Sequence, residues 1–205
     1  MGQSVGTGVR EHGGGGRRQV RARRGRRGRR VRERRPVPGR KRGPRDPGPQ
    51  PRPSQAYAVL TIPRLSLRVP VAEGIGKASV LNHGYVGHYP KTAQPGRAGN
   101  FALAGHRNTH GEPFRYLNRL RRGDTVEVET RTATYTYVVD RTLPQTSASD
   151  GGVIARVPRS TVRPAYGYRS PGYYLTLTTC TPEFTSRYRL VVWGKLASMR
   201  PRAPR

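Results

Sequence analysis

The start of the chain differs sharply in composition from the rest. Residues 1–54 contain almost no large apolar side chains and consist mainly of Arg, Gly and Pro. Such a stretch cannot bury enough apolar surface to offset the entropy lost on ordering, so we expect it to be disordered. Residues 55–197 carry the apolar runs, and roughly 140 residues is a common size for one domain with its own core. The sequence therefore predicts a disordered segment at 1–54, one folded domain at 55–197 and a short basic tail at 198–205.

Apolar residues in the folded part recur mainly in a two-residue alternation, which is typical of strands with one buried face. The expected strands are Tyr57–Ile62, Leu67–Ala72, Asn100–Ala104, Asp124–Thr130, Thr134–Arg141, Tyr173–Thr179 and Arg189–Leu196. Short helical patterns occur at 77–82 and at 113–120, where Pro113 suits a first helical turn. The pattern predicts an all-β fold with short helices, either a barrel or a sandwich.

Both parts of the chain are strongly basic. Residues 1–54 carry 18 Lys and Arg against 3 acidic residues, and the remainder carries 22 against 8, so the formal charges are +15 and +14. Three interpretations of the arginine-rich segment stay open. It is a wrong start or reading frame in GC-rich DNA, a solvated linker, or an arm that binds phosphate-rich partners such as teichoic acids, anionic lipid or nucleic acid.

No run reaches the roughly 18 apolar residues of a membrane span, and no apolar signal-peptide region follows the first charges. We therefore expect neither a visible membrane anchor nor a visible export signal in this chain. The five histidines have a single cysteine to join them, and none of the spacings is typical of a zinc site. We expect no metal and no cofactor.

Cys180 is the only cysteine, so it can form no intramolecular disulfide. It ends a run of alternating Thr and Leu, which places it at the end of the expected strand at 173–179. Side chains two residues apart share a face, so Cys180 is expected on the face opposite Leu175 and Leu177. If the next strand pairs antiparallel, the thiol and Arg189 share one outer surface. Parity alone does not separate Arg189 from Arg187, two residues earlier.

A thiol attacks a carbonyl as the thiolate, so it needs a neighbouring base or cation. His106 is the strongest candidate base, because it follows the apolar run 101–104 and a glycine and so also sits at a strand end. The alternative is a histidine with a purely structural role. His83, His88 and His110 lie in Gly-rich turns and are expected to be solvated loop residues.

Several separate motifs together resemble the sortases, the cysteine transpeptidases of Gram-positive cell surfaces, and most resemble the class E sortases of high-GC actinobacteria. The motifs are Gly-His-Tyr-Pro-Lys-Thr-Ala at 87–93, Gly-Asn-Phe-Ala-Leu-Ala-Gly-His-Arg at 99–107, Leu-Thr-Leu-Thr-Thr-Cys-Thr-Pro at 175–182 and Arg-Leu-Val-Val-Trp-Gly at 189–194. They occur in the family's order, and the resemblance covers residues 57–197.

The resemblance implies an eight-stranded β-barrel with His106, Cys180 and Arg189 at the positions of the family's catalytic triad. It implies cleavage of an LAxTG-like or LPxTG-like sorting signal after its threonine, a thioester on Cys180, and transfer of the acyl group to an amine of a cell-wall precursor such as lipid II. Arg189 would act by electrostatics and position, because a guanidinium stays protonated. Tyr89 would face the second residue of the signal. Thr178 and Thr179 either shape the pocket or are ordinary strand residues.

Two other functions stay open. One is a polyanion or nucleic-acid binder that uses the basic arm, with the barrel as a scaffold; the other is a cysteine hydrolase that uses the same three residues with water as acceptor. The family implies that the partners are surface proteins with C-terminal sorting signals and that the enzyme acts at the extracellular face of the plasma membrane. The basic segment would contact anionic wall polymer or membrane. We expect a monomer.

Overall fold

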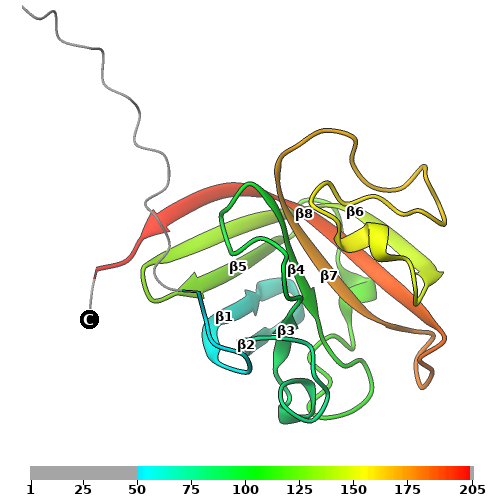
Figure 1. Cartoon of the computed structure of the whole chain (residues 1–205), viewed down its shortest axis with the longest axis horizontal. Helices are drawn as coiled ribbons and strands as arrows, with labels where there is room; N and C mark the ends of the chain where they lie inside the picture. Colours follow the sequence, from blue (N-terminus) through cyan, green and yellow to red (C-terminus); the bar gives the residue numbers. More distant parts are fainter. Residues whose placement is uncertain (1–49, 204–205) are drawn as a thin grey trace, which may run out of the picture. The chain divides into compact units, whose positions relative to one another are not determined.

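The computed structural model describes residues 50–203, which form a closed β-barrel (Figure 1). The strand order around the barrel is β1-β2-β3-β4-β7-β8-β6-β5. The strands are β1 (Ala56–Ile62), β2 (Leu67–Glu73), β3 (Val86–His88), β4 (Gly99–Ala104), β5 (Thr125–Thr130), β6 (Ala133–Ser147), β7 (Tyr173–Thr181) and β8 (Tyr188–Pro201). The helical elements of this part of the chain are four short 3₁₀ turns, η1 (Pro63–Leu65), η2 (Leu81–His83), η3 (Leu117–Arg119) and η4 (Gly151–Ile154).

The expected all-β barrel with only short helical pieces is confirmed. In place of the two helices expected at 77–82 and 113–120, the structure has the single turns η2 and η3. Both patterns are short, and isolated helices of so few residues are not stable on their own. The sequence patterns missed β3, which has three residues and is too short to show an alternation. Within the described part, no helix is long and apolar enough to cross a membrane.

Two strands extend well beyond their expected limits. Strands β6 and β8 pair antiparallel from Ala133 opposite Pro201 to Ser147 opposite Tyr188, with three register shifts along the way. Residues 198–201 of the expected tail therefore belong to a paired strand. Most of the expected disordered segment, residues 1–49, lies outside the described residues. The barrel begins at Ala56, close to the expected domain start at residue 55.

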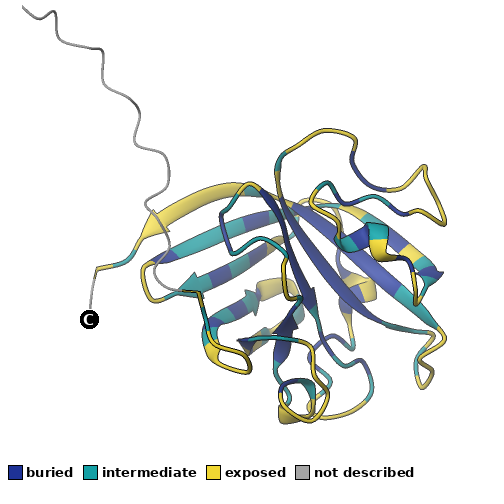
Figure 2. Ribbon diagram, in the orientation of Figure 1, coloured by how far each residue is buried: buried dark blue, intermediate teal, exposed yellow. Residues whose placement is uncertain are grey.

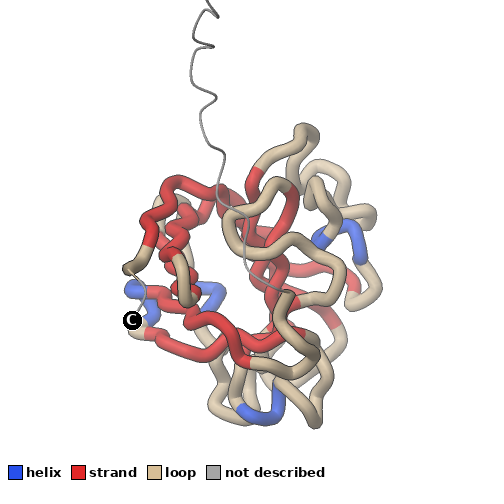
Figure 3. Tube along the Cα trace, turned by 60° about the vertical axis from the view of Figure 1, so that its left-hand side comes forward, coloured by secondary structure: helices blue, strands red, loops and turns tan. Residues whose placement is uncertain are grey.

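The interior of the barrel holds the main hydrophobic core, which is why the strands alternate. Strand β1 illustrates the pattern, since Ala58, Leu60 and Ile62 are buried while the residues between them are only partly covered. Leu175 and Leu177 of β7 enter the same core. In Figure 3 the strands surround one common interior, and these side chains fill it. Burial of each large apolar side chain stabilises the fold by about 1.5 to 3 kcal/mol.

Strand β7 is buried on both faces, so residues Tyr174 to Thr179 show no exposed position (Figure 2). A second hydrophobic cluster covers its outer face and that of β8; it contains Leu143, Val153, Tyr168, Tyr174, Val191 and Trp193. Much of this cover comes from the segment 148–172 between β6 and β7. The indole Nε1–H of Trp193 donates to the Val153 carbonyl at 3.0 Å. Trp193 and Val191 are therefore fully buried, although they lie on the outer face of the barrel.

Asp150 fastens this covering segment to the barrel. Its carboxylate accepts hydrogen bonds from the Thr146 hydroxyl at 2.6 Å, from the Ser160 hydroxyl, and from both the backbone N–H and the hydroxyl of Thr161 at 2.9 Å. Burial alone raises the pKa of Asp150, but the hydrogen bonds from Ser160, Thr146 and Thr161 outweigh it, so the net pKa lies below the ordinary value. One buried carboxylate thus joins the end of β6 to the middle of the segment.

We expect Asp150→Ala to lower the free energy of unfolding by about 2 to 3 kcal/mol, because it leaves several buried donors without an acceptor. Urea denaturation measures the change, and Ser149→Ala, at an exposed neighbour, is the matched control. Since the folded pKa of Asp150 is depressed, its contribution is complete above the unfolded value of about 3.9 and is lost as the pH falls through the folded value. The difference between the variants should therefore shrink in acid; a constant difference would contradict the assignment.

Candidate active site

Cys180 is the next-to-last residue of β7 and is partly exposed. Strand β7 pairs antiparallel with β8, and Cys180 stands directly opposite Arg189. Side chains of directly opposed residues point to the same face of a sheet, with Cβ atoms about 4.5 to 5.5 Å apart. The register therefore places the thiol and the guanidinium of Arg189 on one face, as the parity of the sequence predicts. That face is covered beside Trp193 and becomes more open toward Cys180.

His106 reaches the same row from the other side of β7. Strands β4 and β7 are parallel, and their ladder ends where Ala104 pairs with Thr178. Extending this register by two residues brings His106 level with Cys180. Two further hydrogen bonds continue the contact past the ladder, from the Gly105 N–H to the Thr178 carbonyl at 3.2 Å and from the Thr179 hydroxyl to the Gly105 carbonyl at 2.8 Å. Cys180 and Arg189 thus lie on two neighbouring strands, which are about 4.8 Å apart in a sheet, and His106 follows the end of β4, the neighbour of β7 on its other side.

The His106 ring is held by contacts on the side of η2 and of the following loop. Its Nε2 lies 2.9 Å from Asn82 Oδ1, which can only accept, so Nε2–H is the donor and Nδ1 is the unprotonated nitrogen of the neutral ring. The ring of His110 stacks on it at 5.2 Å between centroids. Partial burial lowers the pKa of His106, and electrostatic interaction with His110 and Lys77 lowers it further. The neutral imidazole is therefore favoured near pH 7.

We expect His110→Ala to raise the pKa of His106, because the substitution removes a neighbouring charge and exposes the ring to more water. The C2-proton resonance of His106, followed by NMR through a pH titration, reports this pKa directly. His83→Ala removes an exposed histidine that makes no ring contact with His106 and serves as control. A pKa that moves equally in both variants, or falls in His110→Ala, would refute the role of the stacked ring.

Gly105 allows the turn that carries His106. A Cβ built on Gly105 would lie 2.7 Å from the ring of Phe114, which is fully buried and cannot yield cheaply. The His106 carbonyl in turn accepts a hydrogen bond from the Phe114 N–H at 3.0 Å. Close packing of Phe114 against this backbone fixes where the histidine leaves the barrel, and only glycine leaves room for it.

Gly105→Ala should therefore lower the free energy of unfolding by about 1 to 3 kcal/mol, the usual penalty for overpacking a closed core. Gly151→Ala is the matched control, since its added methyl meets no atom within 4 Å and its φ is not positive. Urea denaturation measures the free energy of unfolding of both variants, and only that of Gly105→Ala should fall clearly below wild type. Equal stability would mean that the Phe114 ring moves aside freely.

Arg189 holds the chain that returns from Cys180. Its Nη1 donates to the Ser186 carbonyl at 2.8 Å and to the Tyr188 carbonyl at 3.0 Å, which leaves the other donors of the guanidinium available. Arg187 is exposed, precedes β8, and lies 5.1 Å from the centre of the Tyr188 ring. Of the two arginines that parity alone does not separate, Arg189 is the one paired with Cys180.

The residues expected near the substrate fall into two groups. Tyr89 and Thr178 are joined by a hydrogen bond of 3.0 Å between their hydroxyls, and the Thr178 hydroxyl also donates to the Leu103 carbonyl at 3.2 Å. Tyr89 is partly exposed, whereas Thr178 is 3% exposed. Thr179 is 2% exposed, and its hydroxyl is engaged with Gly105. Thr179 thus contributes to the frame of the site, while the Tyr89 ring reaches its edge.

One histidine differs from the expectation of a solvated loop residue. His88 is 1% exposed, with Nδ1 2.7 Å from Glu73 Oε2 and Nε2 2.8 Å from Thr92 Oγ1. His88 is the last residue of the short strand β3, which the sequence pattern does not reveal. All three residues of this strand are buried, so the His88 side chain is shielded from water. His83 and His110 are exposed, as expected, but His110 also stacks on His106. In residues 50–203 no cluster of three His, Cys, Asp or Glu side chains could hold a metal ion.

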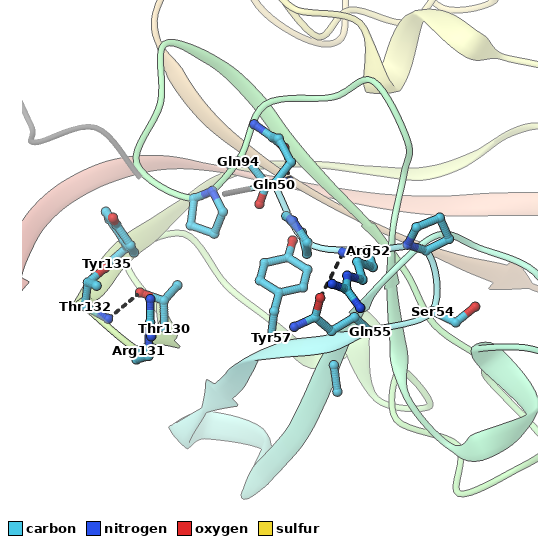
Figure 4. A pocket seen from close by; sticks show the side chains of 14 residues that line it. Gln50, Arg52, Ser54, Gln55, Tyr57, Gln94, Thr130, Arg131, Thr132 and Tyr135 are labelled. Atoms are coloured by element: carbon cyan, nitrogen blue, oxygen red, sulfur yellow. Dashed lines mark hydrogen bonds between the residues drawn. The ribbon is translucent and has the colours of Figure 1, made fainter. Parts of the chain in front are cut away.

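A hollow of about 930 Å³ lies away from this site (Figure 4). It is lined by the segment 50–57, the turn 130–132 and the side chains of Gln94, Pro95 and Tyr135. These residues mark the start of β1, the end of β5 and the start of β6, so the hollow is at the barrel end where β7 begins. Cys180 is at the other end of β7. The size of this hollow therefore gives no argument about the chemistry at the thiol.

A comparison with known families shows the family to which the chain belongs. Residues 60–197 match the sortase domain family, so the chain belongs to the sortases. It is 52% identical to Sortase SrtE1 of Streptomyces coelicolor over 78% of this chain and 46% of that protein. It is 37% identical to Sortase SrtE2 of the same organism over 67% of this chain and 54% of that protein. The chain thus spans about half the length of the curated relatives it matches.

A solved structure extends the likeness to three dimensions. The crystal structure of sortase E1 from Streptomyces coelicolor with a tripeptide in the active site superposes with a TM-score of 0.68 at 52% identity. The match covers 74% of this chain and 94% of that one. Within the family, the chain is therefore similar to the class E sortases.

Three residues beside the site are not predicted by the sequence patterns: Asn82, Arg107 and His110. Asn82 lies 24 positions before His106 and has no local pattern that connects the two. Arg107 follows His106 directly and has the character of a polar turn residue, yet it is 7% exposed. His110, four residues after His106 in a turn with positive φ, offers the one available signal, a second histidine within reach of the first.

Proposed function

We propose that this chain is a cysteine transpeptidase whose catalytic domain spans residues 55–197, with Cys180 as nucleophile, His106 as acid and base, and Arg189 as electrostatic stabiliser. The observation that carries the proposal is the pairing of Cys180 with Arg189 across β7 and β8, together with the position of His106 two residues past the end of β4, the neighbour of β7 on its other side. A thiol, an imidazole and a guanidinium aligned in this way supply the parts needed for acyl transfer.

The chemistry proceeds in two halves. The Cys180 thiol gives its proton to His106, and the thiolate attacks the threonyl carbonyl of the sorting signal. The C–N bond then breaks, His106 returns the proton to the departing glycine amine, and a thioester remains. In the second half an acceptor amine attacks the thioester, His106 takes the amine proton, and the thiolate leaves. The lowered pKa of His106 makes its imidazolium a stronger acid, which favours protonation of the leaving amine.

Arg189 stabilises the negative charge that develops on the carbonyl oxygen, or holds the substrate backbone. Its Nη1 is already bonded to the carbonyls of Ser186 and Tyr188, so the side chain is preorganised before substrate arrives. A preorganised donor in such a position commonly contributes about 10²-fold to 10³-fold in rate.

The substrate is an LAxTG-like or LPxTG-like signal at the C-terminus of a surface protein, and the acceptor is an amine of a peptidoglycan precursor such as lipid II. The Tyr89 hydroxyl forms a polar pair with the hydroxyl of Thr178, two residues before Cys180 on β7, which suits recognition of the second residue of the signal. The tripeptide in the active site of the Streptomyces coelicolor sortase E1 structure supports a peptide as ligand.

The family acts at the cell surface, and we place this enzyme at the outer face of the plasma membrane as a monomer. The basic segment 1–54, with its formal charge of +15, would contact anionic wall polymer or lipid. Such a contact is separate from the chemistry at Cys180, because phosphate binding requires no thiol paired with a histidine and an arginine.

The test is mass spectrometry of the full chain incubated with LAxTG and LPxTG peptides, with and without an amine acceptor. Wild type should give an amine-linked product, and Cys180→Ala should give none. His106→Ala should lose about 10²-fold to 10⁴-fold in rate. Arg189→Ala should lose about 10²-fold or more, while Arg187→Ala, its exposed neighbour, should stay within a few-fold of wild type.

Release of free acid alone, with a range of acceptor amines present, would make the chain a cysteine hydrolase. A folded wild type with neither cleavage nor thioester would remove the catalytic assignment for these signals and favour the polyanion binder. Equal losses in Arg187→Ala and Arg189→Ala would contradict the role given to the register with Cys180.

A further inference from the structure

Arg107 is buried beside the candidate nucleophile, although arginine is rarely buried in folded proteins. Its side chain is 7% exposed. Its Nη1 donates to the Cys180 carbonyl at 3.1 Å and to the Thr181 hydroxyl at 2.9 Å. Its Nη2 lies 3.8 Å from Glu183 Oε1, in the loop between β7 and β8. The guanidinium of Arg107 therefore forms hydrogen bonds with the last two residues of β7 and approaches the loop that follows.

Arg107 is next to His106 in the sequence, so its contacts with β7 also affect the position of His106. A single peptide bond joins Arg107 to His106. The same short stretch of backbone therefore carries the candidate base and the side chain that is hydrogen-bonded to the Cys180 carbonyl. The β4–β7 ladder ends two residues before His106, where Ala104 pairs with Thr178. Gly105 makes two hydrogen bonds beyond that ladder, and the Arg107 side chain then extends the connection between the histidine turn and the end of β7.

The burial of the Arg107 guanidinium is not explained by a gain in folding stability. Removing a guanidinium from water is expensive, and a carboxylate at 3.8 Å with 36% of its side chain exposed compensates for it only in part. The Arg107 Nε–H is buried without an acceptor among the described residues, a kind of atom that native structures usually satisfy. An apolar side chain of similar volume would avoid both penalties. The geometry that Arg107 imposes is therefore the feature that explains its presence.

We propose that Arg107 is a positioning residue for acyl transfer, which sets the placement of His106 relative to Cys180 by fixing the main chain of the nucleophile to the main chain of the base. The proposal rests on the proposed function, since it assigns a role to Arg107 in the same reaction. Arg107 itself touches neither the reacting sulfur nor the substrate. Its effect appears in the rate of thiol chemistry, because misplacing catalytic groups by about 1 Å can lower a rate by about 10²-fold.

The experiment compares Arg107→Ala, Arg107→Lys and Arg115→Ala in the full chain. Arg115 is the matched control: it belongs to the loop that follows His106, is paired with Glu112 instead of the β7 end, and is about one-third exposed. Arg107→Ala should lower kcat for an LAxTG peptide by about 10²-fold, with KM changed less than about threefold. Arg107→Lys keeps the charge but not the fork-shaped pair of donors, so it should recover only part of the rate. Arg115→Ala should match wild type.

Two further readouts separate positioning from a general loss of structure. Millimolar guanidinium ion should restore part of the rate of Arg107→Ala and none of that of His106→Ala. The pH dependence of Cys180 alkylation by iodoacetamide, which needs no peptide, should shift in Arg107→Ala toward the profile of His106→Ala. Thr181→Val removes one acceptor of the guanidinium at nearly constant shape and should give an intermediate profile. It keeps the test decisive if Arg107→Ala does not fold.

The outcomes distinguish failure of the positioning role of Arg107 from failure of the proposed transpeptidase function. If wild type cleaves no peptide, the proposed function fails, while the alkylation profiles still test whether Arg107 links the histidine to the thiol. If wild type is active and Arg107→Ala, folded, has the same kcat and alkylation profile, the positioning role is overturned. An increase in KM alone in Arg107→Ala would equally overturn it, because that result would place Arg107 in substrate binding.

Discussion

Strand β7 is the constraint on which the rest of the structure depends, because it pairs parallel with β4 on one side and antiparallel with β8 on the other. The β8 register places Arg189 directly opposite Cys180. The β4 register ends at Ala104 opposite Thr178, and His106 follows two residues later. A slip of one residue in either pairing would turn the thiol toward the barrel core and its partners away from it. The position of Arg189 beside Cys180 is thus a property of backbone pairing.

The burial of β7 on both faces explains why this register is so firmly set. The barrel core holds Leu175 and Leu177 on one face, and the second cluster around Trp193 holds the other. A slip of one residue would drive threonine hydroxyls into the barrel core and remove Leu175 and Leu177 from it. Precision at the thiol is thereby supported by packing that reaches far along the strand.

Local pattern is enough for the strands with a clear alternation and for the placement of Cys180 and His106 at strand ends. It fails where the information is not local. Strand β3 has too few residues for a pattern, and it buries His88 against Glu73, a partner that comes from β2. The ends of β6 and β8 extend because they pair with each other over a long stretch, which neither segment alone displays. Arg107 has the sequence character of an exposed polar residue, because only the fold shows its acceptors at the end of β7.

The covering segment between β6 and β7 divides into an anchored base and an exposed tip. Asp150, Val153 and Tyr168 tie its two ends to the barrel, whereas residues 162–166 are exposed throughout. The tip is closed on itself, since the Ser160 N–H donates to the Tyr166 carbonyl at 3.1 Å. No side chain of residues 162–166 belongs to the second cluster, so the side chains of the tip can be exchanged without removing any member of that cluster.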